Sequence, residues 1–235
     1  LGLPADGFHV ILANPPFSGR VDRDRIVEDV KVGTTTATEL LFLKYMMDSL
    51  RPGGRCGVIV PEGVLFGSTG AHKELRRQLI ENNRVEAVLS LPGGVFQPYS
   101  GVKTSVLFFR KGGSTERVQF LHADDDGYKL DANHDTPIEA DDLPALAQAY
   151  ILRESAWDKW TARDAAAEWG EKWWFADSAT LRANDFNLSA GRYRPMSQAQ
   201  VEHRDPRELL DELAAIEAEI VEEIAALRAE LANSQ

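Results

Sequence analysis

The sequence predicts an α/β protein whose sheet is mostly parallel with one antiparallel strand, followed by a helical C-terminal extension. Short apolar runs end at prolines, as buried strands do. Segments with the spacing of amphipathic helices separate most of these runs, which is typical of a sheet covered by helices. Beyond residue 206, apolar residues recur in steps of three and four, which predicts one long helix.

The first half of the chain contains the predicted sheet. The connection over 92–102 is rich in Gly and Pro and has no helical pattern, so the strand after it should run antiparallel to its neighbours. Residues 20–36 are polar and are expected to form a mobile loop. We predict strands over 8–13, 56–60, 85–91 and 103–110, the first of them buried, and helices over 39–50 and 72–82.

The second predicted helix has an apolar side and a charged side. Leu75, Leu79 and Ile80 follow helical spacing and should face the core. Arg76 and Arg77 are then expected on the solvent side.

The second half of the chain is less regular. Residues 117–122 fit a further strand, and residues 140–160 fit a mostly helical segment. The acidic stretch over 124–127 lacks the spaced ligands of a calcium loop, so it predicts a solvated turn rather than a metal site. Three tryptophans flank a short strand-like segment, where core packing is favoured over stacking on bases; they are Trp169, Trp173 and Trp174.

Composition and charge predict three domains. They are 1–121, which contains most of the predicted sheet, an acidic α/β extension over 122–200, and a long amphipathic helix over 201–235. The first holds 15 Lys and Arg against 12 Asp and Glu, whereas the last holds 3 against 10. The net charge of -11 argues against a generic nucleic-acid coat. The mildly basic first domain still allows a focused contact with phosphate.

Composition also limits the cellular compartment and the kinds of site that the sequence predicts. The single cysteine, Cys56, excludes an internal disulfide and a cysteine-rich zinc site, and it favours a reducing cytoplasm. No apolar run reaches the ~18 residues that a membrane span needs. His72 and His122 are isolated in the sequence and are expected to be surface residues rather than catalysts.

The predicted terminal helix carries one narrow apolar stripe, which needs a partner helix. Its acidic character and terminal position favour a partner on another chain, although a partner within this chain remains open. The stripe consists of Leu209, Leu213, Ile216, Ile220, Ile224, Leu227 and Leu231.

The strongest candidate for chemistry is Asn14-Pro15-Pro16-Phe17, which directly follows the first predicted strand. Open α/β sheets place their ligands at the carboxyl ends of their strands. The two prolines stiffen the backbone, so the Asn14 side-chain oxygen and the Pro15 carbonyl can accept hydrogen bonds from one exocyclic amine. Phe17 offers an apolar ring on which an extruded base can stack.

Residues 8–17, FHVILANPPF, resemble the catalytic motif of N6-adenine DNA methyltransferases. Further stretches narrow the resemblance to the modification subunit of type I restriction-modification enzymes, and together they cover most of residues 8–194. They are TELLFL over 38–43, LRPGGR over 50–55, PEGVLFG over 61–67, LPGGVF over 91–96, GVKT over 101–104, and DFNLS over 185–189 with Arg192 and Tyr193.

The resemblance implies transfer of a methyl group from S-adenosylmethionine to a flipped adenine in DNA. Asn14, Pro15, Pro16 and Phe17 would be catalytic, and Asn14 would also touch the cofactor. The implied partners are DNA, a specificity subunit, a second modification subunit and a restriction subunit, without a membrane. In the family topology the strands expected here take the order 4-5-7-6, and strand 4 pairs with a strand 1 that precedes this sequence.

The family binds its cofactor with a Gly-rich turn upstream of the catalytic motif, and no Gly-x-Gly pair occurs in this chain. We therefore expect the C-terminal half of a modification subunit, inactive by itself. The loop after the third strand, with Phe96, Tyr99, Lys103 and Thr104, is expected to close over the base or touch the DNA backbone. The alternative for this loop is a plain crossover in the sheet.

Two other functions remain open from the sequence. The chain could be an assembly module that docks on a specificity subunit through its terminal helix and performs no chemistry. It could also belong to a stand-alone adenine methyltransferase with its own recognition domain.

Overall fold

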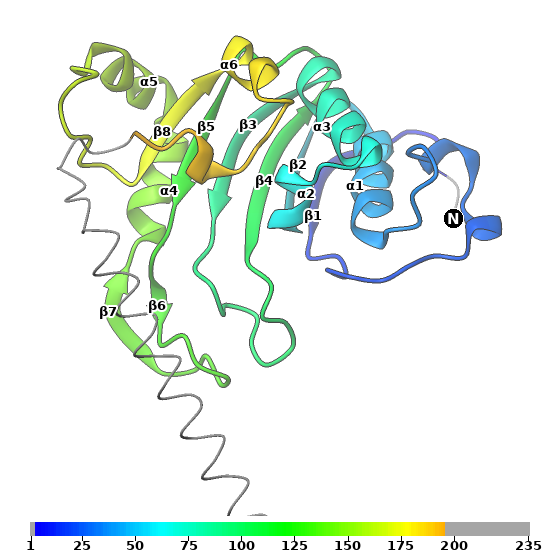
Figure 1. Cartoon of the computed structure of the whole chain (residues 1–235), viewed down its shortest axis with the longest axis horizontal. Helices are drawn as coiled ribbons and strands as arrows, with labels where there is room; N and C mark the ends of the chain where they lie inside the picture. Colours follow the sequence, from blue (N-terminus) through cyan, green and yellow to red (C-terminus); the bar gives the residue numbers. More distant parts are fainter. Residues whose placement is uncertain (1–2, 196–235) are drawn as a thin grey trace, which may run out of the picture. The chain divides into compact units, whose positions relative to one another are not determined.

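The computed structural model describes residues 3–195, which are built around one six-stranded sheet. The strand order is β1-β2-β4-β3-β5-β8 (Figure 1). The strands are β1 (Phe8–Ala13), β2 (Leu50–Pro61), β3 (Asn83–Ser90), β4 (Thr104–Lys111), β5 (Arg117–His122) and β8 (Trp173–Asp177). Four of them, β1, β2, β3 and β5, run in one direction, and β4 and β8 run against it.

The antiparallel course of β4 confirms the prediction made from the helix-free connection before it. β3 ends at Ser90, the chain turns back within residues 91–103, and β4 then lies between β2 and β3. The order of the first four strands is the one that the family resemblance implies. β8 adds a second antiparallel strand, so the sheet continues beyond residue 121, where the first predicted domain ends.

Helices α1 (Thr38–Ser49) and α3 (Gly70–Asn82) cover one side of the sheet, and the short α2 (Glu62–Phe66) connects β2 to α3 (Figure 1). The side chain of Thr69 caps α3 by accepting a hydrogen bond from the backbone N–H of His72. Leu75, Leu79 and Ile80 are fully buried, as predicted.

The expectation that Arg76 faces solvent is wrong, because only 2% of this residue is exposed. Its guanidinium donates hydrogen bonds to the carbonyl oxygens of Phe186 at 3.0 Å, Val64 at 3.1 Å and Gly67 at 2.9 Å. Buried carbonyls need such partners, so the side chain joins α3 to two irregular segments. Nearby, Asp185 pairs with Lys73 at 2.8 Å.

On the other side of the sheet, α4 (Leu143–Ile151) packs against β5 and stacks Tyr150 on Phe108 of β4, with 4.9 Å between ring centroids. α5 (Arg153–Ala162) and α6 (Ser178–Ala183) flank β8. Trp173 and Trp174 are buried in β8, which confirms core packing for these two rings. Trp169 packs edge-on against Trp173 at 5.1 Å.

Two expectations for the acidic region need correction. The stretch over 124–127 is not only a turn, because β6 (Asp126–Tyr128) begins within it and pairs with β7 (Pro137–Asp141). The segment over 140–160 starts in β7 and divides into α4 and α5. The loop over 20–36 contains two short 3-10 turns, Arg23–Arg25 and Glu28–Val30.

The expectation that the first strand is buried is also wrong. Within the described residues, β1 pairs only with β2 and forms the edge of the sheet. Three apolar side chains that alternate along β1, and therefore share one face of the sheet, are exposed: Phe8 at 48%, Val10 at 49% and Leu12 at 82%.

The predicted helix beyond residue 206, and with it the domain over 201–235, lies outside the described residues. None of the helices in residues 3–195 is long and apolar enough to cross a membrane.

Candidate active site

The carboxyl ends of the parallel strands lie together along the lower side of the sheet in Figure 1. This side, called the carboxyl edge, is distinct from the outermost strand β1. Asn14 follows β1 there, Glu62 follows β2, and His122 ends β5. Because β4 is antiparallel, its first residue lies at the same edge, and Lys103 directly precedes it. The topology therefore gathers polar side chains from strands that are far apart in the sequence.

Asn14 is exposed, as the predicted chemistry requires, and Phe17 is half-buried. Within residues 3–195, no group forms a hydrogen bond with the Asn14 side chain, so its amide oxygen is available to a ligand. Pro15 and Pro16 cannot donate to a neighbouring strand, which ends the pairing of β1. The motif therefore leaves the sheet at the carboxyl ends of the parallel strands, where open α/β sheets bind ligands.

The loop over 91–103 folds back onto this motif. The ring of Phe96 packs edge-on against the ring of Phe17, with centroids 4.9 Å apart and planes inclined by 71°. Tyr99, farther along the loop, is 94% exposed. The structure thus brings together two of the aromatic residues predicted for base contact and leaves the third on the surface.

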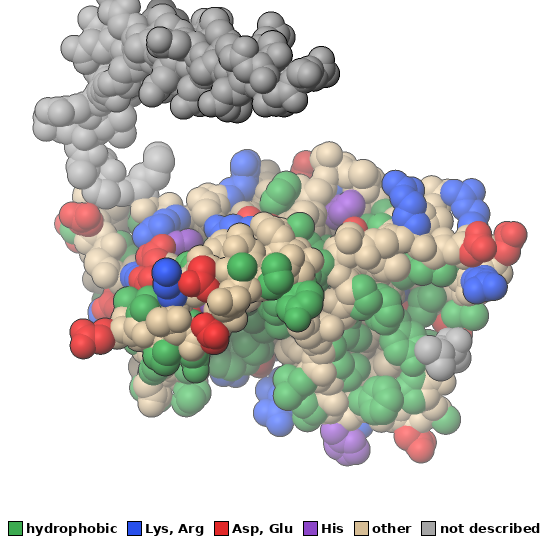
Figure 2. Space-filling view, turned by 90° about the horizontal axis from the view of Figure 1, so that it is seen from below, with side chains coloured by type: hydrophobic (Ala, Val, Ile, Leu, Met, Phe, Trp, Pro, Cys, Tyr) green, Lys and Arg blue, Asp and Glu red, His purple; other side chains and the backbone are tan. Residues whose placement is uncertain are grey.

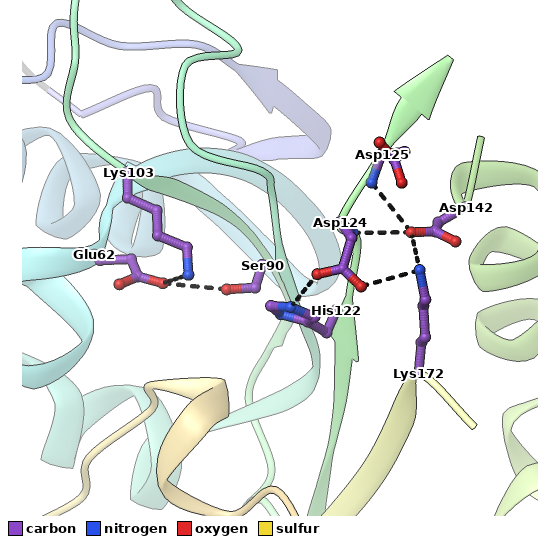
Figure 3. Close-up of polar contacts among 8 residues, drawn as sticks. All are labelled: Glu62, Ser90, Lys103, His122, Asp124, Asp125, Asp142 and Lys172. Atoms are coloured by element: carbon purple, nitrogen blue, oxygen red, sulfur yellow. Dashed lines mark hydrogen bonds and ion pairs between the residues drawn. The ribbon is translucent and has the colours of Figure 1, made fainter. Parts of the chain in front are cut away.

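Lys103 lies where the loop returns to the sheet, and 44% of its side chain is exposed. Its ammonium lies 3.5 Å from a carboxylate oxygen of Glu62, which also accepts a hydrogen bond from the Ser90 hydroxyl at 3.1 Å (Figure 3). Thr104 is only 1% exposed and pairs with Pro61 in the sheet, so its side chain does not reach the surface where DNA would lie.

Glu62 and Ser90 were not predicted from the sequence as site residues. Both lie at the carboxyl end of a predicted strand, Glu62 after the proline that ends one and Ser90 just before the next proline. Their position at strand ends was the available signal, but neither residue type by itself points to a site.

A second polar cluster lies farther along the same edge, and it corrects the expectation that His122 is isolated. The His122 ring lies 3.0 Å from Asp124, and Lys172 pairs with Asp124 at 3.0 Å and with Asp142 at 2.6 Å (Figure 3). The hydrogen bond from Lys172 lowers the pKa of Asp124 below its usual value. Asp142 in turn accepts hydrogen bonds from the backbone N–H groups of Asp124 and Asp125.

Next to the exposed edge strand, a cavity of about 160 Å³ lies open on the sheet. Its walls include Val10, Leu12 and Gly57 from the strands and Tyr150 from α4. Cys56 borders the same cavity, and burial raises the pKa of its thiol to about 12, so it stays protonated. Viewed from below Figure 1, hydrophobic side chains gather toward the middle of the protein surface, and most charged side chains lie toward its sides (Figure 2).

Residues 4–203 match the family described as N-6 DNA Methylase. The chain belongs to this family. The sheet with its antiparallel β4 is therefore the fold of a member of this family.

Relatives of this chain include methylase subunits of type I restriction enzymes. The type I restriction enzyme EcoEI methylase subunit of Escherichia coli is 33% identical over 214 residues, which are 90% of this chain and 41% of that protein. The type I restriction enzyme StySJI methylase subunit of Salmonella typhimurium is 30% identical over 197 residues, 81% of this chain and 36% of that protein.

A solved structure supports the same relationship. A chain from a type I restriction-modification system, studied for its assembly and conformational transition, has a TM-score of 0.60 and 30% identity. That match covers 98% of this chain and 46% of the other. The chain spans about two fifths of the length of the curated relatives named above.

Proposed function

We propose that this chain provides the catalytic motif of a type I modification methylase, which methylates the N6 amine of a flipped adenine in DNA. The observation that carries the proposal is the meeting of the Asn14 motif with the loop over 91–103, through the 4.9 Å contact of Phe17 with Phe96. An exposed amide next to two aromatic rings at a ligand-binding edge suits a flat base that carries an amine.

The Asn14 side-chain oxygen and the Pro15 carbonyl oxygen each accept a hydrogen bond from one N–H group of the adenine amine. These hydrogen bonds draw the nitrogen lone pair out of conjugation with the ring and orient it for attack. When bound, S-adenosylmethionine supplies the electrophilic methyl group. Asn14 and Pro15 would hold the amine nitrogen toward that methyl group, and the amine would lose one proton to solvent after the transfer.

Phe17 provides the surface on which the adenine ring stacks, and Phe96 covers it from the loop. In the present conformation the two rings fill the space between them, so entry of a base must displace Phe96. Tyr99 and Lys103 lie on the exposed part of the loop and its base, where they can contact the DNA backbone. Thr104 supports the loop from within the sheet.

The residues described fit the cofactor only in part. Asn14 is exposed at the end of β1, but within residues 3–195 β1 pairs with a strand on one side only, and Leu12 and Val10 are open to solvent. The rest of the cofactor pocket must therefore come from polypeptide that packs against this free edge. We propose that the upstream half of the methylase supplies it.

The proposed partners are DNA, a specificity subunit, a second modification subunit and a restriction subunit, in the cytoplasm. The amphipathic pattern over 206–232 is the proposed contact with the specificity subunit. The exposed Asn14 and the aromatic pair beside it favour a catalytic role over that of a docking module alone.

Single-turnover methylation of target DNA by the assembled enzyme tests the proposal. Asn14→Ala removes one of two acceptors for the amine, so we expect the rate to fall by roughly 10²–10³-fold, as for the loss of one transition-state hydrogen bond. Asn133→Ala, at an exposed loop position, is the matched control and should leave the rate unchanged. A wild-type rate for Asn14→Ala would refute the assignment.

A further inference from the structure

We propose that Glu62 is a positioning residue that holds Lys103 in the absence of DNA and yields it to a DNA phosphate when DNA binds. The proposal deepens the proposed function and rests on it. Glu62 competes with the phosphate for one cation, and it therefore sets how tightly the methylase holds DNA.

Glu62 contacts both ends of the loop that carries Phe96. Its backbone N–H donates to the Lys103 carbonyl at 3.0 Å, and its carboxylate lies 3.5 Å from the Lys103 ammonium. The same carboxylate oxygen accepts a hydrogen bond from Ser90, the last residue of β3 before the loop (Figure 3). One carboxylate therefore lies between the two strands from which the loop extends.

The sheet order places this carboxylate beside the catalytic motif. β2 lies between β1, which ends at Asn14, and β4, which begins after Lys103. The position is unusual for an acidic residue, because DNA bound at this edge brings a dense row of negative charge. A fixed carboxylate there opposes DNA binding unless a cation accompanies it.

The two partners differ in their freedom to move. The Glu62 side chain is 20% exposed and is held by Ser90, whereas the Lys103 side chain is 44% exposed. A lysine carries its charge on a flexible four-carbon stem, so the ammonium can turn from Glu62 to a phosphate without movement of the backbone. The ion pair is partly solvated, which keeps the exchange reversible.

The variant that isolates the charge is Glu62→Gln, which keeps the volume and an oxygen that accepts from Ser90. In the assembled enzyme, we expect it to bind duplex DNA about three- to tenfold more tightly at low salt. Lys103→Met should weaken binding and reduce the slope of log affinity against log salt by about one. In the Lys103→Met background, Glu62→Gln should have much less effect, because its cation is gone.

Glu81→Gln is the matched control, because it removes the charge of a carboxylate near the end of α3, at the opposite end of the strands from Ser90. It should leave DNA affinity and its salt dependence unchanged. Equal affinity of Glu62→Gln and the unmodified enzyme would overturn the proposal. The same tightening with and without Lys103 would also overturn it, because Glu62 would then act only through its general charge.

Failure of the proposed function appears in a different measurement. Normal methyl transfer by Asn14→Ala refutes the catalytic role of Asn14. It does not decide the role of Glu62, which the DNA affinity of Glu62→Gln tests separately. Loss of methyl transfer in Asn14→Ala, with unchanged DNA affinity in Glu62→Gln, refutes only the role of Glu62.

Discussion

Phe17 and Phe96 come from loops that are about eighty residues apart, and their rings meet edge-on with 4.9 Å between centroids. Edge-to-face packing is favourable for aromatic rings, so the pair closes the proposed base site. The same contact means that an entering adenine must separate the rings before it can stack.

The first prediction follows from this contact. Phe17→Ala removes the surface on which the base stacks and should weaken binding of the flipped base by roughly 1–3 kcal/mol. Phe96→Ala removes the ring that blocks entry of the base, so the target base should leave the DNA helix faster. It also removes the ring that covers the bound base, so the base should bind less tightly. Fluorescence of DNA with 2-aminopurine at the target position would measure both effects. Tyr128→Ala, at a 43% exposed aromatic position in β6, is the control and should leave base extrusion unchanged.

The second prediction concerns acid stability. The hydrogen bond from Lys172 lowers the pKa of Asp124, so the interaction stabilises the fold above the unfolded-state pKa of this carboxyl group. That contribution is lost as the pH falls through the lower folded-state pKa. Lys172→Met should therefore destabilise the protein at pH 7 and have little effect at about pH 2. Urea unfolding at a series of pH values measures the difference.

Lys129→Met provides the control for this experiment. Lys129 also pairs with an aspartate, Asp131, but backbone N–H groups of His134 and Asn133 are the main cause of the low pKa of Asp131. Removal of Lys129 should thus change the pH dependence less than removal of Lys172. Equal changes for the two variants would contradict the role given to Lys172.

The third prediction concerns the buried Arg76. Arg76→Met leaves the carbonyl oxygens of Phe186, Val64 and Gly67 without this donor, so we expect a loss of about 2–4 kcal/mol in the free energy of unfolding. Arg77→Met, one position along the same helix, removes only surface pairs with Glu74 and Glu81 and should cost much less stability. Denaturant unfolding of the two variants compares them. Similar losses would show that the three carbonyls find other partners.

Much of the sheet could be predicted because its signals are local. The apolar runs that became β2, β3, β4 and β5 end at prolines or change in composition, and the helix-free connection after β3 required the antiparallel β4. The inward side of α3 followed from apolar spacing in the same way. The motif at Asn14 was recognisable because its residues are contiguous.

The errors arose where distant segments decide the environment. Arg76 is charged, and its burial depends on carbonyls of residues 64, 67 and 186, which no local pattern connects to it. β1 looked like a buried strand because its side chains are apolar on both faces, but the face with Phe8, Val10 and Leu12 is exposed. Glu62 was missed because its importance depends on the loop that returns through Lys103.

The exposed edge of β1 carries the last prediction. Leu12 is 82% exposed, so Leu12→Lys should change the stability of this chain alone by no more than about 0.5 kcal/mol. In the assembled methylase, a lysine at this position would oppose the packing of upstream polypeptide against the edge. We expect this variant to lose S-adenosylmethionine binding in the assembly, measured by titration calorimetry, and the chain alone to bind the cofactor weakly or not at all.

Leu152→Lys, at a 57% exposed apolar position next to α4, is the control and should bind normally. Tight cofactor binding by this chain alone would show that its own residues complete the pocket, and the free edge would then need another explanation.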